Sequence, residues 1–496
     1  MEKQKEVVPN DIAKGRSPES RYSENRSAEN ALAGNRSSAG RKQGVPGILL
    51  AAPASGSGKT AVSCALMGAF QKNGLAVKAC KCGPDYIDPM FHSRVIGTRS
   101  GNLDTFFTDY ATTRYLFGEA ASEADLSVIE GVMGYYDGLG GISEKASSSD
   151  VALALEAPVV LIVNCRGMSM SAVPLVKGFL EYEKERHIQG VILNQMPEAL
   201  YRDLKKEIEE KLPVRVLGYV PKADNLVLES RHLGLVLPGE IERLKEKLNE
   251  LSALLEKTID LDALIQMAEG APELPFEKPE LPALPEGERI KVGVARDEAF
   301  CFTYRDNLRM LEEMGAELVP FSPLSDSRLP EGLQGLILSG GYPELHAAAL
   351  AANSSMRKEI REAVEGGLPC IAECGGFLYL HRTLEGEDGQ KYPMAGVLDA
   401  EAYRTGKLSR FGYITLTAER TQLLLPRGGQ IRGHEFHYWE SESCGDAMEA
   451  KKPLRKRSWS CVHGTETLYA GFPHLFFWSN PDAAWNFLKK CGERRC

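Results

Sequence analysis

The sequence predicts an α/β protein with two doubly wound domains. Short apolar runs alternate with segments of helical periodicity along most of the 496 residues, which favours parallel strands covered by helices on both faces. Two glycine turns, at 53–60 and 374–376, each stand between an apolar run and a helical pattern. A stretch rich in proline and glutamate at 269–289 is typical of a linker. We therefore expect domains at 45–268 and 290–492 on either side of it.

The N-terminal domain is expected to contain short parallel strands. Its apolar runs have the length of buried strands, and the segments between them have helical periodicity. A longer helical pattern at 240–267 closes the domain. The expected strands lie at 48–51, 76–81, 126–130, 159–164, 190–194 and 216–220, and the expected helices lie at 61–72, 112–122, around 150, 172–185 and 199–211.

The C-terminal domain begins with the same alternation and then changes character. Short extended pieces with glycine turns fill residues 394–475, which predicts an antiparallel edge. The expected strands before it lie at 290–295, 318–321, 335–338 and 369–373, and the expected helices lie at 303–314, 354–366 and 481–490.

Composition and charge restrict the classes of partner and compartment. The net charge of −9 argues against nucleic acid as the main partner, and no apolar run is long enough to span a membrane. The first residues lack the apolar core of a secretory signal, and an odd count of 11 cysteines suits reduced thiols in the cytoplasm. Residues 1–44 are rich in Ser, Asn, Arg, Lys and Glu, so we expect a disordered extension there.

The segment 53–60 predicts a loop that binds the phosphates of ATP. Glycines at 56 and 58 let the backbone turn its N–H groups toward phosphate oxygens, the lysine reaches the terminal phosphates, and the threonine hydroxyl can bind Mg²⁺. The strict pattern has glycine where this chain has Pro53, so the loop is a variant. The residues expected to bind ATP are Gly56, Ser57, Gly58, Lys59 and Thr60.

Acidic side chains follow the strands of the same predicted sheet. Because the carboxyl ends of parallel strands line the ligand crevice, carboxylates placed there can hold a cation that bridges phosphates. We expect Thr60, Asp85 and Glu130 to bind Mg²⁺, and Asp88 and Asp137 to lie nearer the substrate. Acids that merely cap helices in surface loops are the alternative for any one of them. Cys80 and Cys82 have C-x-C spacing but no second pair, so alternation along a strand explains them better than a metal site.

Cys374 is the predicted nucleophile of the C-terminal domain. An apolar strand ends at this residue, two glycines follow, and a helical pattern begins at 377. A nucleophile on such a turn projects from the sheet, and the N–H groups that follow it can stabilise an oxyanion. We also expect the helix N-terminus to lower the thiol pKa. A buried structural cysteine is the alternative, and a second glycine turn at 339–344 favours catalysis.

Several motifs resemble known enzymes. Ser-Gly-Gly-Tyr-Pro-Glu at 339–344, the turn at Cys374 and Gly-His-Glu-Phe-His-Tyr at 433–438 resemble class I glutamine amidotransferase domains, which are flavodoxin-like, of the cobyrinic and cobyric acid synthase type. Lys-Cys-Gly-Pro-Asp-Tyr-Ile-Asp-Pro at 81–89 and the segment 130–138 are similar to the a,c-diamide synthetase branch of that family, which is related to dethiobiotin synthetase. The resemblance covers about residues 46–490.

The resemblance implies an amidation that depends on ATP and glutamine. Cys374 would cleave glutamine through a thioester with His474 as its base, and Gly341 and Gly375 would supply the oxyanion N–H groups. Many class I amidotransferases have glutamate two residues after that histidine, but this chain has Phe476. The group that orients His474 is therefore open. Two other histidines, His434 and His437, compete for the role of the base.

The same resemblance implies a corrin-type macrocycle as the acceptor. ATP would phosphorylate a peripheral carboxylate of cobyrinic acid, and ammonia would displace the phosphate. Tyr86 and Ile87 would then lie beside the ring. Hydrogenobyrinic acid and nickel-sirohydrochlorin remain alternative acceptors, and a nucleotide-dependent scaffold with an inactive amidotransferase domain is a remote alternative. The expected partners are these small molecules, without nucleic acid or membrane, and the sequence is compatible with a homodimer but leaves the oligomeric state open.

Overall fold

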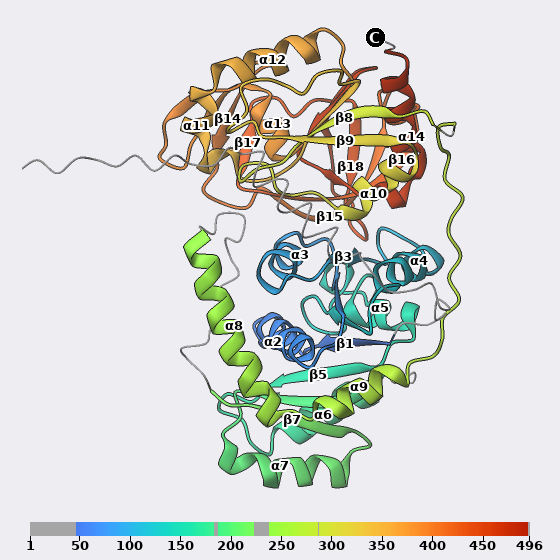
Figure 1. Ribbon diagram of the computed structural model, residues 1–496, viewed down its shortest axis with the longest axis vertical. Helices are drawn as coiled ribbons and strands as arrows, with labels where there is room; N and C mark the ends of the chain where they lie inside the picture. Colours follow the sequence, from blue (N-terminus) through green and yellow to red (C-terminus); the bar gives the residue numbers. More distant parts are fainter. Residues whose placement is uncertain (1–45, 183–186, 223–237, 286, 495–496) are drawn as a thin grey trace, which may run out of the picture. The chain divides into compact units, whose positions relative to one another are not determined.

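The computed structural model describes residues 46–182, 187–222, 238–285 and 287–494 (Figure 1). The predicted disordered extension at 1–44 lies outside the described residues, as do the last residues of the helix expected at 172–185. None of the described helices is both long enough and apolar enough to cross a membrane.

The N-terminal domain is built on a parallel sheet of seven strands, which confirms the predicted fold class. The strand order is β3-β2-β4-β1-β5-β6-β7, so the first strand lies in the middle of the sheet. The sequence pattern missed β3, because its residues, Ser-Gly-Asn-Leu, do not form an apolar run. The strands are β1 (Gly47–Ala51), β2 (Val77–Cys82), β3 (Ser100–Leu103), β4 (Leu126–Glu130), β5 (Val159–Asn164), β6 (Ile188–Asn194) and β7 (Arg215–Val220).

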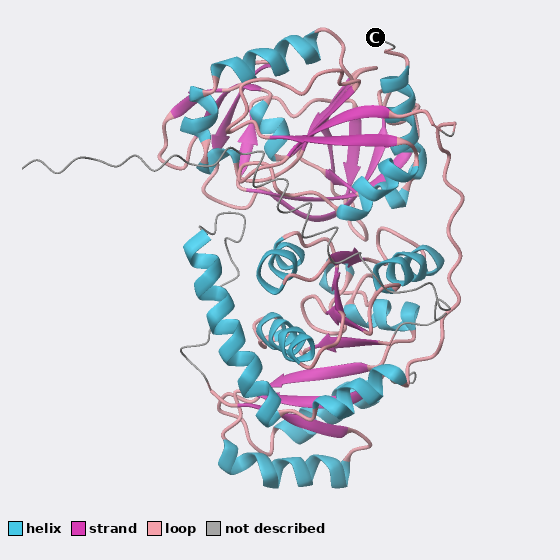
Figure 2. Cartoon of the chain, viewed as in Figure 1, coloured by secondary structure: helices cyan, strands magenta, loops and turns pink. Residues whose placement is uncertain are grey.

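Helices cover both faces of this sheet (Figure 2). Alternate residues of β1 point to opposite faces: Leu49 belongs to one buried cluster, and Ile48 and Leu50 belong to another. The helical pattern at 240–267 is two helices, because Asp260 breaks it and caps the second by accepting a hydrogen bond from Ala263 N–H. One face carries α2 (Lys59–Lys72), α8 (Pro238–Thr258) and α9 (Leu261–Glu269), and the other carries α4 (Tyr110–Ala121), α5 (Ser148–Leu155), α6 (Ala172–Tyr182) and α7 (Glu198–Lys211).

The C-terminal domain has a central sheet of six strands in the order β20-β21-β11-β10-β8-β9. Every neighbouring pair is parallel except β20 and β21. Its strands are β8 (Ile290–Ala295), β9 (Ala316–Phe321), β10 (Gly335–Leu338), β11 (Cys370–Glu373), β20 (His463–Gly464) and β21 (Leu468–Gly471), and its helices are α10 (Arg305–Glu313), α11 (Ala347–Ala352), α12 (Ser354–Glu365), α13 (Gly375–Tyr379) and α14 (Pro481–Gly492).

The strands of residues 394–475 pair mostly antiparallel, as predicted, but they do not form one edge. Most of them build two further sheets, and β21 joins the central sheet as a parallel strand. Alternation along a strand shows that one face is buried, but it does not show which strand is the partner. The further sheets are β13-β12-β14-β17 and β19-β18-β15-β16-β22, built from β12 (His381–Glu385), β13 (Lys391–Pro393), β14 (Leu398–Arg404), β15 (Arg410–Ala418), β16 (Gln430–His437), β17 (Trp439–Ser441), β18 (Met448–Lys451), β19 (Ser458–Cys461) and β22 (His474–Leu475).

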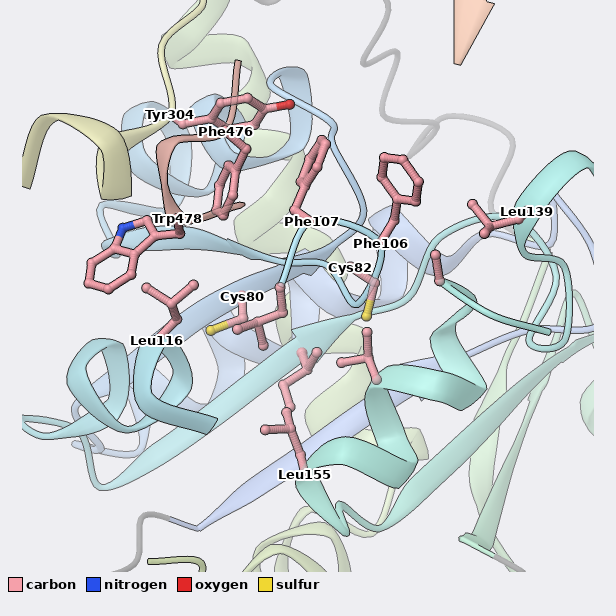
Figure 3. Packing of buried hydrophobic residues seen from close by; sticks show 14 of the residues in the cluster. Cys80, Cys82, Phe106, Phe107, Leu116, Leu139, Leu155, Tyr304, Phe476 and Trp478 are labelled. Atoms are coloured by element: carbon pink, nitrogen blue, oxygen red, sulfur yellow. The ribbon is translucent and has the colours of Figure 1, made fainter. Parts of the chain in front are cut away.

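Aromatic side chains join the two domains into one buried cluster (Figure 3). The ring of Phe107 stacks on that of Phe476 with centroids 4.8 Å apart, and Tyr304 meets Phe476 edge-on at 5.1 Å. The Tyr413 hydroxyl donates a hydrogen bond to Asp104 Oδ2 at 2.7 Å. Arg432 donates hydrogen bonds to the carbonyl oxygen of Phe106. These contacts hold the five-stranded sheet against the carboxyl ends of β2 and β3.

The Asp104 contact predicts a pH-dependent stability. Burial raises the pKa of Asp104 to about 7, although the Tyr413 hydroxyl and nearby backbone N–H groups lower it. An acid whose pKa is higher in the folded chain than in the unfolded chain favours folding less as it ionises, so this residue costs stability increasingly as the pH rises from about 4 to about 7. We expect Asp104→Asn to raise the Tm relative to the wild type more at pH 8 than at pH 5.

Tyr413→Phe is the matched variant for this contact. It removes a hydrogen bond that stabilises the ionised carboxylate, so the Tm should fall more steeply between pH 5 and pH 8 than in the wild type. A difference between wild type and Asp104→Asn that does not change with pH would contradict the assignment.

Candidate active sites

The phosphate loop joins β1 to α2, as the sequence predicts. Gly56 and Gly58 both have positive φ angles, of 75° and 91°, which a residue with a Cβ rarely adopts. A Cβ at Gly58 would also lie 2.3 Å from Nδ2 of Asn194, whose amide donates to the carbonyl oxygen of Ser57 at 2.8 Å. Asn194 is the last residue of β6, and no other feature of the sequence indicates that it contacts the loop. The glycines therefore let the loop close over the end of the sheet.

Lys59 and Thr60 begin α2 and point toward the segment after β4. The Lys59 ammonium donates to the carbonyl oxygen of Met133, and the Thr60 hydroxyl donates to Glu130 Oε1 at 2.6 Å. Burial and the neighbouring Lys81 lower the pKa of Lys59 to about 8. A phosphate bound on the loop would offset the cost of burying the charged Lys59, because it brings negative charge to the desolvated ammonium.

Glu130 is the centre of a buried charge cluster. Its Oε1 accepts hydrogen bonds from Thr60 and, at 2.9 Å, from Lys81, and its Oε2 lies 3.0 Å from Nε2 of His92. Burial would raise the pKa of Glu130, but Lys81 and His92 hold it well below its usual range. Lys81 also pairs with Asp88 at 2.6 Å. The sequence pattern did not indicate a role for Lys81 or His92, although an isolated lysine in an apolar strand can indicate a buried ion pair.

The predicted magnesium ligands are only partly brought together. Thr60 and Glu130 present a hydroxyl and a carboxylate in direct contact, which are oxygen ligands of the kind that Mg²⁺ prefers. Oδ1 of Asp85 instead accepts the backbone N–H of Ile87 at 2.7 Å, so this carboxylate supports the turn before α3 (Ile87–Phe91). A different buried group, Cys64, His92 and Glu130, has ligand atoms within 4.8 Å of one another, but burial raises the pKa of the Cys64 thiol, which disfavours the thiolate that would bind a metal.

The residues predicted to lie near the acceptor have different surroundings. Burial and the nearby Glu130 raise the pKa of Asp88 to about 8. Asp137 accepts the backbone N–H of Gly134 at 2.9 Å and lies close enough to Lys59 to affect its pKa. Ile87 is partly buried and packs against the core cluster on the α2 face of the sheet. Asp88 thus lies beside Lys81, and Asp137 lies near Lys59.

Cys374 occupies the predicted sharp turn between β11 and α13. Its backbone has φ 46° and ψ −99°, a strained conformation for a residue with a side chain. Burial, and next the carboxylates of Glu344 and Glu435, raise the thiol pKa, although the Gly375 N–H lowers it. The expectation that the helix N-terminus makes this thiol acidic is therefore wrong, since α13 has only five residues and burial outweighs its effect on the pKa. The thiol needs a base.

The two predicted oxyanion residues lie side by side. A Cβ on Gly375 would come within 2.8 Å of the backbone nitrogen of Gly341, and a Cβ on Gly341 would come within 2.1 Å of the carbonyl oxygen of Ala299. Only glycine permits these approaches. The N–H group of Gly341 is therefore held next to the residue that follows the nucleophile.

His474 lies on β22 and packs over the same glycine turn. A Cβ on Gly340 would lie 2.3 Å from Cε1 of its ring. Its Nδ1 is buried without a hydrogen bond, and the nearest carboxylate, Oε2 of Glu373, lies 3.7 Å away. The other oxygen of Glu373 is fixed by the N–H of Leu475 at 3.0 Å. Glu373 directly precedes the predicted nucleophile, and no feature of the sequence indicated a role for it.

The competing histidines have other surroundings. Both ring nitrogens of His437 are engaged, by the carbonyl oxygen of Trp439 at 2.5 Å and by Glu435 Oε1 at 2.9 Å. His434 lies opposite His474 in the β16–β22 pair, and burial, with the charge of His474, lowers its pKa to about 3. A histidine with so low a pKa is a weak base. These contacts favour His474 as the partner of the thiol.

Tyr86 connects the loop at 83–88 to the site around Cys374 and His474. Its ring lies 5.1 Å from that of His474, 4.4 Å from that of Tyr304 and 5.4 Å from that of Phe302, measured between centroids. Burial, Tyr304 and Glu373 raise the pKa of its hydroxyl. The prediction placed Tyr86 beside the acceptor, whereas the structure places it against the histidine of the C-terminal domain. Residues 83–88 therefore contact both candidate sites.

Comparisons with known proteins agree with this two-site organisation. Residues 48–236 match the model of the CobQ/CobB/MinD/ParA nucleotide binding domain, and residues 291–482 match that of the CobB/CobQ-like glutamine amidotransferase domain. The chain is 41% identical to a cobyrinate a,c-diamide synthase of Caldanaerobacter subterraneus, over 90% of this chain and 98% of the relative. It is 39% identical to that of Listeria innocua, over 88% and 97%, and 34% identical to that of Priestia megaterium, over 90% and 96%.

Removal of Lys81 should destabilise the fold strongly. Lys81→Met leaves Glu130 without its main counter-charge, and breaking a buried ion pair from one side costs about 3–5 kcal/mol. The matched control is Lys358→Met, which removes an exposed pair with Glu362 in α12 and should cost less than about 0.5 kcal/mol. Urea unfolding followed by circular dichroism measures both. Equal, small losses would show that the cluster does not stabilise the sheet.

Proposed function

The chain belongs to the cobyrinate a,c-diamide synthase family, and we propose that it converts the a and c side-chain carboxylates of cobyrinic acid into amides in cobalamin biosynthesis, using ATP and glutamine. As a member of this family it is a carbon–nitrogen ligase that takes its nitrogen from glutamine. The observation that carries the proposal is the loop at 83–88. Its Asp88 pairs with Lys81 beside the phosphate loop, while its Tyr86 packs on His474 beside the nucleophile.

In the C-terminal domain Cys374 attacks the side-chain amide carbon of glutamine. His474 takes the thiol proton, and the N–H groups of Gly341 and Gly375 stabilise the negative charge that forms on the amide oxygen. The proton then passes to the leaving nitrogen, so ammonia leaves and a thioester remains. Water hydrolyses the thioester to glutamate and restores the thiol. The raised pKa of the buried thiol is the reason that a base is needed at all.

Glu373 orients His474 in this scheme. Many amidotransferases place a glutamate two residues after the histidine, but here that position is Phe476, which stacks on Phe107 of the other domain. A carboxylate 3.7 Å from the unpaired Nδ1 can close to hydrogen-bond distance when the imidazole becomes protonated, because the attraction then rises. The hydrogen bond from Leu475 N–H holds that carboxylate beside the histidine.

In the N-terminal domain an acceptor carboxylate attacks the terminal phosphate of ATP. The bond to the β-phosphate breaks and ADP leaves, so the product is an acyl phosphate, which supplies the good leaving group that a carboxylate lacks. Ammonia then attacks the acyl carbon, phosphate leaves, and the nitrogen loses a proton to give the amide. Backbone N–H groups of the loop at 56–60 hold the phosphates, and Lys59 and Lys81 balance their charge. Thr60 and Glu130 are the residues that fit Mg²⁺, and the ion would neutralise charge on the phosphate oxygens. Asp85, the third predicted ligand, would have to leave its contact with the N–H of Ile87 to join them.

The domain limits and the setting are part of the proposal. We assign the synthetase reaction to residues 45–268 and the glutaminase reaction to residues 290–492, joined by the linker at 269–289. Among the described residues of that linker there is no helix or strand after α9. A cytoplasmic location suits the ten described cysteines, all of which are free thiols.

Mass spectrometry of the reaction product tests the proposal. Cobyrinic acid incubated with the protein, Mg²⁺, ATP and glutamine should gain two amides in succession. Cys374→Ser should be inactive with glutamine but active with ammonium, because the synthetase site is intact. If cobyrinic acid stays unmodified while ATP and glutamine turn over, the acceptor is wrong, and hydrogenobyrinic acid and nickel-sirohydrochlorin are the alternatives to test.

Glu373→Gln should lower the glutaminase kcat at least about tenfold, since loss of an orienting group weakens general base catalysis. Amidation supported by ammonium should continue. Glu365→Gln on the exposed face of α12 is the control and should behave as wild type. An unchanged glutaminase kcat in Glu373→Gln would refute the role.

A further inference from the structure

Three exposed aromatic rings form a row on the five-stranded sheet of the C-terminal domain. Phe411 on β15 is 55% exposed, Phe436 on β16 is 43% exposed, and Tyr438 just beyond β16 is 46% exposed. The centroids of Phe411 and Phe436, and those of Phe436 and Tyr438, are 5.6 Å apart. Most large apolar side chains of the described residues are buried, so a contiguous row of this kind indicates a binding surface.

The row continues the face of the sheet that touches the N-terminal domain. Phe411 pairs with Phe436 and Tyr413 pairs with His434, so the side chains of these two pairs lie on the same face. The Tyr413 hydroxyl bonds to Asp104, and it would lie 3.6 Å from a Cβ on Gly83. The exposed rings therefore begin at the residue pair next to Tyr413 and His434 on the same face, close to the carboxyl ends of β2 and β3. The loop at 83–88 starts at the end of β2.

A basic loop flanks the row. It is the segment 451–457 between β18 and β19, Lys-Lys-Pro-Leu-Arg-Lys-Arg, and its Lys452 donates to the carbonyl oxygen of Phe411. Together with Thr415, residues 451–456 line a pocket of about 390 Å³. Thr415 pairs with Lys451 and follows Tyr413 on the same face of β15. At its far side Arg455 donates to the carbonyl oxygen of Gly140, three residues from Asp137.

We infer that the aromatic row and the basic loop together bind the acceptor, a flat conjugated macrocycle that carries carboxylates around its rim. A flat ring can stack on the exposed faces of Phe411 and Phe436, and the rim carboxylates can pair with Lys and Arg side chains in the pocket. The Arg455 contact places this surface beside the segment that carries Asp137. The inference rests on the proposed function and assigns its acceptor site to the C-terminal domain.

Charge favours this occupant over a second copy of the chain. The basic loop has five cationic side chains in seven residues, so two copies meeting at this surface would bring like charges together. The chain as a whole is negatively charged, at −9, and a polycarboxylate is repelled from most of it. The basic loop is therefore a place where electrostatics and an apolar platform favour the same ligand.

Binding of cobyrinic acid to the full chain, followed by the absorption of the macrocycle, tests the inference. Phe411→Ala/Phe436→Ala should raise the Kd at least about tenfold, as the loss of stacking partners does at other aromatic platforms. Lys451→Glu/Lys456→Glu should raise the Kd and flatten its dependence on salt. The KM for cobyrinic acid should rise in both double variants, while the KM for ATP should stay within about twofold.

Two control variants and the oligomeric state complete the test. Tyr403→Ala, on β14 of the four-stranded sheet, removes an exposed ring, and Lys358→Glu, on α12, removes an exposed cation. Both should leave the Kd unchanged. If the wild type amidates cobyrinic acid but the double variants bind it normally, the inference fails and the proposed function stands. If the wild type neither binds nor amidates it, the proposed acceptor fails and the inference fails with it. A change in sedimentation with an unchanged Kd would show an interface between copies instead.

Discussion

The contact between Tyr86 and His474 is the interaction on which the account of this enzyme depends. The ring comes from the N-terminal domain, packs against Tyr304 and Phe302 of the C-terminal domain, and lies 5.1 Å from the imidazole of the candidate base. Two residues further, Asp88 is held by Lys81 in the charge cluster around Glu130. A rearrangement of this short loop therefore moves groups at both sites, because neither end is free of contacts. The glutaminase and synthetase sites are thus parts of one structure.

Packing between the domains also explains an unusual feature of the glutaminase site. Phe476 lies where many amidotransferases have a glutamate, and its ring is used here to stack on Phe107 and to meet Tyr304. Burial of a large aromatic side chain stabilises by about 1.5–3 kcal/mol, a gain that a charged carboxylate could not supply in that position. The carboxylate near His474 is instead that of Glu373, at the end of β11. The interface ring, Phe476, and the candidate base, His474, therefore lie two residues apart at the end of β22.

The sequence predicted what periodicity and glycine turns can show. It gave the parallel N-terminal sheet, the phosphate loop and the turn at Cys374, because these depend on local patterns. It missed β3, and it misjudged residues 394–475, because strand pairing depends on distant partners. The roles of Lys81 and Glu373, the position of Tyr86 and the high thiol pKa follow from burial and from contacts between distant segments. The spacing of residues in a single sequence does not predict contacts between distant segments.

In the mechanism that we propose, ammonia released at Cys374 is consumed within the same molecule. A competition between two nitrogen sources tests it most directly. The enzyme is given cobyrinic acid, Mg²⁺, ATP and glutamine labelled with ¹⁵N in its side-chain amide, in the presence of excess unlabelled ammonium, and the isotope content of the two new amides is measured. The account predicts that both amides are labelled far above the share of ¹⁵N in the total ammonia of the solution. Labelling equal to that share would show that the ammonia escapes before it reacts, and would contradict the account.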